Sequence, residues 1–87
     1  MKPTIQEQLK ALWEDYWTGS EYHNGVRDGI KHAQKLIDLG LTPLATAEHL
    51  FWEANAVEAV RGERFSKGYL IEGRIVGMRK AAYLIQG

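Results

Sequence analysis

Two stretches of this chain, 48 positions apart, carry the same spacing of small residues, and this repeat limits what the chain can fold into. The repeated positions are Gly25, Gly29 and Ala33 in the first stretch and Gly73, Gly77 and Ala81 in the second. Residues four apart share one face of a helix. A glycine inside a helix costs about 1 kcal/mol relative to alanine, so a compensating contact is needed. The pattern, which we call the glycine ridge, predicts two helices packed backbone to backbone.

Local signals divide the chain into four helices. Thr4 and Glu7 have the spacing of a capping box, and Ser20 is placed to cap a second helix. Gly40-Leu-Thr-Pro43 reads as a helix stop followed by an N-cap and a first-turn proline. Gly62 and Ser66 suggest the last boundary. The expected helices cover residues 5–17, 21–39, 43–61 and 67–86.

These elements predict an all-α fold in a single domain, residues 1–87. We expect a small four-helix bundle made of two αα-hairpins related by internal duplication. The last helix is apolar nearly all round, and the third carries a second apolar strip opposite its main one. Because this surface exceeds what one copy can cover, we predict a homo-oligomer, most simply a two-fold dimer. The alternative is a monomer in which the last helix is central. The second strip of the third helix consists of Ala45, Trp52, Ala56, Ala59 and Val60.

Large aromatic side chains are numerous for a chain of 87 residues. Tryptophan and tyrosine often anchor protein–protein interfaces, although they also fill cores. The candidates for contact with a second copy or another protein are Trp13, Trp17, Phe51, Trp52, Ile75 and Tyr83.

The charge balance gives no overall attraction for nucleic acid, since 11 basic residues face 11 acidic ones. Residues 61–80 are locally basic, however, and offer an alternative function as a small nucleic-acid-binding regulator. The turn near Gly40 could also belong to a helix-turn-helix, but Glu48, Glu53 and Glu58 make the following helix unsuitable for a phosphate-lined groove. The residues of the alternative nucleic-acid face are Arg61, Arg64, Lys67, Arg74, Arg79 and Lys80.

Catalytic, cofactor and metal sites have little support in the sequence. The chain has no cysteine, and both serines stand at expected helix caps. His32 follows Asp28 by four residues, and Glu53 follows His49 by four, so each pair can share a helix face. Such pairs are usually solvated surface partners. We therefore predict no catalytic residue, no cofactor and no metal ligand.

The functional expectation is a non-enzymatic helical module that binds another protein, as a small adaptor or inhibitor does. The N-terminus lacks the apolar core of a signal peptide, and Arg74, Arg79 and Lys80 interrupt the apolar C-terminal stretch. We therefore expect a cytoplasmic protein with no membrane association. The chain resembles the short reading frames common in phages and mobile elements, which would place it in the cytoplasm of a host.

Overall fold

The computed structural model describes residues 3–16, 19–64 and 69–87, with the backbone alone for residues 61–64. These residues form four helices: α1 (Ile5–Glu14), α2 (Glu21–Asp38), α3 (Pro43–Arg64) and α4 (Tyr69–Gln86). No strand occurs in the described part of the chain. The all-α prediction is confirmed, and the four helices pack into one compact bundle.

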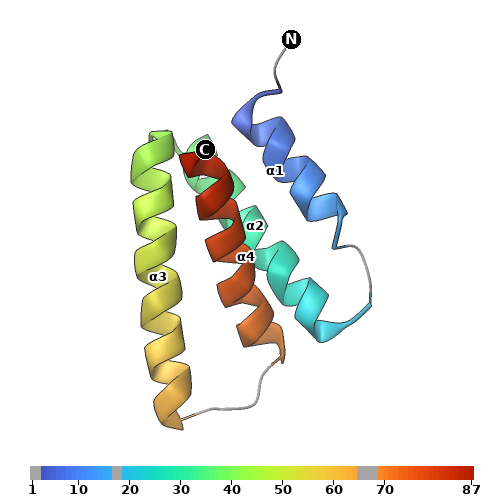
Figure 1. Ribbon diagram of the computed structural model, residues 1–87, viewed down its shortest axis with the longest axis vertical. Helices are drawn as coiled ribbons and strands as arrows, with labels where there is room; N and C mark the ends of the chain where they lie inside the picture. Colours follow the sequence, from blue (N-terminus) through green and yellow to red (C-terminus); the bar gives the residue numbers. More distant parts are fainter. Residues whose placement is uncertain (1–2, 17–18, 65–68) are drawn as a thin grey trace.

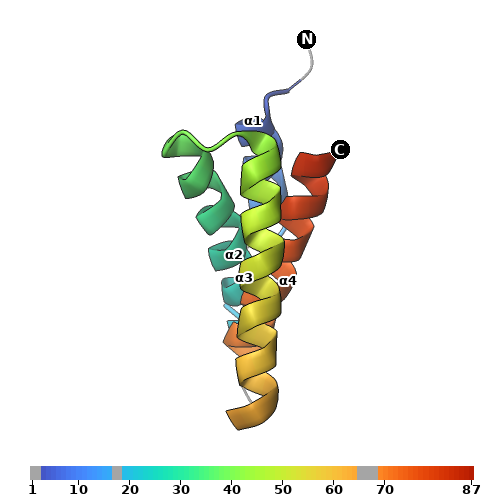
Figure 2. The same ribbon diagram turned by 90° about the vertical axis from the view of Figure 1, so that its left-hand side faces the viewer.

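Helices α2 and α4 form the central pair of this bundle (Figure 1). Helix α3 packs along one side of the pair, and α1 lies on the other (Figures 1 and 2). Successive helices run in opposite directions, so the two central helices run parallel to each other. The longest extent of the molecule is 44 Å and the shortest 20 Å.

The caps of α1 and α2 and the turn expected from the sequence are present in the structure at the same residues. The Thr4 hydroxyl accepts a hydrogen bond from the Glu7 backbone N–H at 3.1 Å, and the Glu7 carboxylate accepts one from the Thr4 N–H at 2.9 Å. Ser20 caps α2 by accepting from the His23 N–H. Gly40 has a φ of 101°, the left-handed conformation that glycine adopts without strain. These contacts fix where α1 and α2 begin and where the chain turns into α3.

The glycine ridge lies where α2 crosses α4. A Cβ atom added to Gly25 would meet the carbonyl oxygen of Leu70, and one added to Gly73 would meet that of Tyr22. Leu70 and Tyr22 are themselves 48 positions apart, so the contact is reciprocal. A Cβ at Gly29 would lie 2.6 Å from backbone atoms of α4. The two helices therefore touch backbone to backbone, and a larger residue in the ridge would push them apart.

The hydrophobic core surrounds this crossing and draws on all four helices. Its only buried polar residue among those described is Thr46, whose hydroxyl donates to the Thr42 carbonyl oxygen at 2.8 Å. The buried apolar side chains are Leu9, Val26, Ile30, Ala33, Leu36, Ala47, Leu50, Ala54, Ile75, Met78, Ala81, Ala82 and Ile85.

Four helix ends differ from the expected ones, and α2 differs only in ending at Asp38, one residue early. Helix α1 ends at Glu14, three residues before the expected end, with Asp15 as its C-cap. Helix α3 continues through Gly62 to Arg64, because a single glycine weakens a helix by only about 1 kcal/mol without breaking it. The expected cap Ser66 lies outside the described residues, and α4 begins at Tyr69.

Candidate functional site

The outward side of α3 carries an apolar strip that no other part of the described chain covers. The strip is the one expected from the sequence: Ala45, Trp52, Ala56, Ala59 and Val60, all of them exposed. Trp52 is 68% exposed, although an indole has more apolar surface to bury than most side chains. The opposite side of the same helix supplies buried core residues such as Leu50 and Ala54. Helix α3 therefore has two apolar faces, and only one of them is covered by the residues that the structure describes.

The other aromatic candidates lie in different places. Phe51 is half-buried, and its ring meets the exposed ring of Tyr83 edge to face at a centroid distance of 5.0 Å. This pair joins α3 to α4. Ile75 is only 2% exposed and belongs to the core, so its selection as an interface residue was wrong. The all-round apolar pattern of α4 concealed which side faces α2. Trp17 lies outside the described residues.

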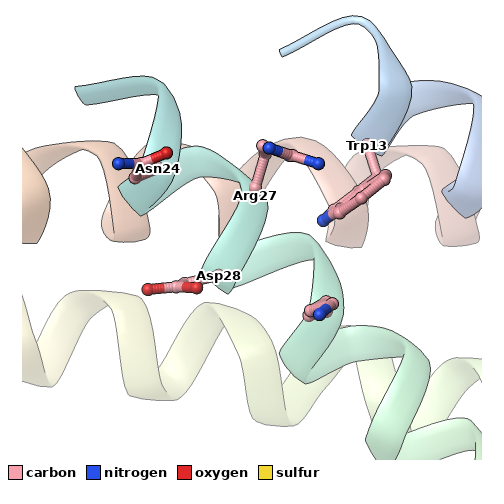
Figure 3. Close-up of a pocket in the computed structure, with 5 residues that line it drawn as sticks. Trp13, Asn24, Arg27 and Asp28 are labelled. Carbon is pink, nitrogen blue, oxygen red and sulfur yellow. The ribbon is translucent and has the colours of Figure 1, made fainter. Parts of the chain in front are cut away.

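Trp13 joins α1 to α2 through a pocket of about 310 Å³ (Figure 3). The Arg27 guanidinium carbon lies 3.7 Å from the centroid of the Trp13 ring, and the Lys31 ammonium lies 5.6 Å from it. Figure 3 shows Arg27 beside the indole, whereas Asp28 extends from α2 away from it. Asn24 completes the lining. The lining carries two cations and one carboxylate, a formal charge of +1, and both cations lie against the Trp13 ring, so these contacts hold α1 on α2.

The expected basic face is not gathered on one side of the described structure. Arg79 donates hydrogen bonds to the Glu58 carboxylate at 3.0 Å and to the Asn55 side-chain oxygen at 2.9 Å, so α3 occupies its guanidinium. At about 100° per residue, Arg74 lies roughly 140° around α4 from Arg79 and roughly 120° from Lys80. The Arg61 and Arg64 side chains and all of Lys67 lie outside the described part.

A polar cluster joins α2 to α3. His32 Nε2 lies 2.6 Å from Glu53 Oε2, and His49 Nε2 lies 3.3 Å from the same oxygen. The two imidazole rings are 6.1 Å apart between centroids. The side chains of His32 and Glu53 are about a quarter exposed, and that of His49 is 43% exposed. We call these three residues the His–Glu cluster.

Helical spacing alone does not reveal this cluster, because its members come from two different helices. The spacing of His49 and Glu53 identified half of it. His32 was paired with Asp28 on α2, but its ring turns instead to Glu53 on α3. A search for histidines and carboxylates on helices expected to be neighbours could have found the third member.

Comparisons with protein-family models, with curated proteins and with solved structures found no match to this chain. None of the described helices combines the length and the apolar character needed to cross a membrane. The functional argument therefore rests on the surfaces and side-chain clusters themselves.

Proposed function

We propose that this chain is a non-enzymatic interaction module that binds through the outer strip of α3. The observation that carries the proposal is the exposure of Trp52 in the middle of a strip of small apolar residues. Exposed tryptophans surrounded by apolar surface are typical anchors of protein–protein contacts. The flanking alanines let another helix approach closely enough to cover the indole.

We infer that the first occupant of the strip is α3 of a second copy. Ala45, Trp52 and Ala59 follow one another at intervals of seven residues, so they lie along one line of the helix. Two such helices can pair antiparallel about an axis through Trp52. The Ala45 end of one helix then meets the Ala59 end of the other, and the two indoles stack at the centre. The pattern is self-complementary, as a two-fold interface requires.

The size of this contact predicts a dimer of modest strength. Helix α3 has 22 residues, which is about 33 Å of helix. One helix–helix contact of this length falls at or below about 1,200 Å² of buried surface, the range of weak and transient interfaces. Reversible dimers suit an adaptor or inhibitor that exchanges partners. The related proposal of internal duplication is supported by the reciprocal contacts of the glycine ridge.

The test is the solution mass across a dilution series, by sedimentation or light scattering. We expect the mass to rise toward twice the 9.9 kDa chain as concentration increases. Trp52→Glu should remain a monomer at the same concentrations, because it buries a charge at the centre of the contact. Tyr83→Ser is the matched control: Tyr83 is 65% exposed but lies on α4, and its loss should leave the dimer intact.

Two results would reject the proposal. One is a single-chain mass for the wild type at every concentration up to the millimolar range. The other is an unchanged dimer in the Trp52→Glu variant, with circular dichroism showing that the variant is folded. In the second case the self-contact would lie on another face of the molecule.

A further inference from the structure

We propose that His32, His49 and Glu53 form a binding site for a divalent transition-metal ion, with Zn²⁺ as the best-suited ion. All three ligands come from one chain, and the site borders the dimer contact proposed above, because the centroid of the His49 ring lies 6.2 Å from that of Trp52. His32 lies on α2, and the other two ligands lie one turn apart on α3. The side-chain atoms able to bind a metal all lie within 4.8 Å of one another.

The ligand chemistry selects the class of ion. Two imidazole nitrogens and one carboxylate oxygen match the three-ligand zinc sites that keep a fourth position for water. Ca²⁺ and Mg²⁺ prefer sites made of oxygen ligands, and the cluster offers only one carboxylate. Imidazole is a good ligand for zinc, copper, nickel and iron. One carboxylate and two neutral rings carry a charge of −1, which offsets half the charge of a divalent ion.

The distances are close to those that a bound ion requires. With zinc–ligand bonds of about 2.0–2.1 Å, atoms around a tetrahedral ion lie about 3.3 Å apart. The distance from His49 Nε2 to Glu53 Oε2 is already 3.3 Å. His32 Nε2 now lies at hydrogen-bonding distance, 2.6 Å, from the same oxygen. Small side-chain rotations would separate that pair and bring the two rings together.

A bound ion would take the place of the hydrogen in the bond between His32 and Glu53. A carboxylate only accepts hydrogen bonds, so His32 Nε2 carries the hydrogen in its bond to Glu53. When a metal binds, Nε2 of each ring offers its lone pair instead, and the ring hydrogen resides on Nδ1. Both rings keep contact with solvent, which gives an ion a route to the site.

The backbone around the cluster holds the ligands in place before any ion arrives. The turn between α2 and α3 is short, with Gly40 in the left-handed conformation. Ala33, which follows His32 in the sequence, and Leu50, which follows His49, are both buried in the core. Because the two helices are fixed by the core, the ligands need little ordering when an ion binds, which favours affinity.

The experiment is calorimetric titration of ZnCl₂ into the full chain after chelator treatment and dialysis. Co²⁺ serves as a second probe, since its visible absorption reports the number and type of its ligands. We expect one ion per chain and the absorption of a four-coordinate Co²⁺ site. His49→Ala and Glu53→Gln should each weaken binding at least about tenfold. Both positions are partly exposed, and circular dichroism checks that each variant is folded.

The matched control is His23→Ala, which removes a histidine from the same helix as His32. The His23 ring lies beside Tyr16 and Tyr22, apart from the cluster. We expect the affinity of the His23→Ala variant for Zn²⁺ to stay within about twofold of the wild-type affinity. Equal weakening by the control and the cluster variants would show nonspecific histidine binding and overturn the proposal.

Three further results would also overturn it. Absence of a saturable signal with either ion would mean that the cluster is only a hydrogen-bonded contact between helices. Unchanged affinity in both His49→Ala and Glu53→Gln would place the ion elsewhere. One ion for every two chains would show that a second copy supplies ligands and that the single-chain site is wrong.

Discussion

The glycine ridge makes a quantitative prediction about a single methyl group at Gly29. A Cβ atom there would lie 2.6 Å from the carbonyl oxygen of Arg74 and from the backbone nitrogen of Met78. Ordinary contacts of this kind begin at 3.4 Å, so the two backbones must separate by about 0.8 Å. Backbone atoms within a helix cannot rotate away as a flexible side chain can. The substitution Gly29→Ala therefore disturbs the whole crossing of α2 and α4.

The size of the destabilisation follows from the van der Waals contacts that are lost when α2 and α4 separate. A gap of about 0.5–1 Å removes roughly a quarter to a half of the van der Waals attraction across a contact. Val26, Ile30 and Met78 are completely buried around the crossing, and burial of such a side chain stabilises by about 1.5–3 kcal/mol. The better helix propensity of alanine returns about 1 kcal/mol. We expect Gly29→Ala to lower the free energy of unfolding by about 1–3 kcal/mol.

Thermal unfolding followed by circular dichroism measures this change. In a domain of this size, 2 kcal/mol corresponds to a fall in Tm of about 8–16 °C. Gly19→Ala is the control, because a Cβ there would meet no atom within 4 Å and the φ of Gly19 is not positive. Its Tm should change by only a few degrees. A Gly29→Ala protein that melts within about 2 °C of the wild type, or above it, would refute the close packing of α2 on α4.

Two further predictions concern α1. Hydrogen bonds from the Thr4 backbone N–H, and secondarily from its hydroxyl, lower the pKa of Glu7 from 4.5. The Glu7 carboxylate therefore stabilises the folded state above pH 4.5, and this stabilisation is lost as the pH falls through the lowered pKa. Glu7→Gln should therefore lower Tm at pH 7 by an amount that shrinks below pH 4.5, whereas a constant difference would contradict the assignment. Arg27→Met should cost about 1 kcal/mol and shift the Trp13 fluorescence, because it removes the cation over the indole. Lys31→Met, which removes the more distant cation, should cost less than half as much, and equal losses in urea unfolding would argue against the Arg27 contact.

The local parts of this structure were predictable because their causes lie within a few residues of sequence. A capping box needs only Thr4 and Glu7, three positions apart, and both of its hydrogen bonds are present. The turn after α2 needs only a glycine with a left-handed φ followed by a cap, which Gly40 and Thr42 supply. The glycine ridge was predictable as well, since glycines repeated inside a helix weaken it unless another backbone packs against them.

Relations between helices were harder to predict because they depend on how each helix is rotated about its axis. Ile75 looked available for a partner until the fold turned it toward the core. Arg79 looked like part of a basic face, but α3 places Glu58 and Asn55 within its reach. In both cases the sequence gives the residue type, whereas the neighbouring helix decides its surroundings.

The sequence by itself determined that the chain forms four helices, that Thr4, Ser20 and Thr42 cap the first three, and that α3 has two apolar faces. Only the tertiary structure decided that His32 meets Glu53, 21 residues away, and that α3 leaves Trp52 exposed. The physical reason is the range of the interactions. Caps, turns and helical periodicity act within one or two turns of chain, whereas a cluster shared by two helices exists only once packing has fixed their rotation.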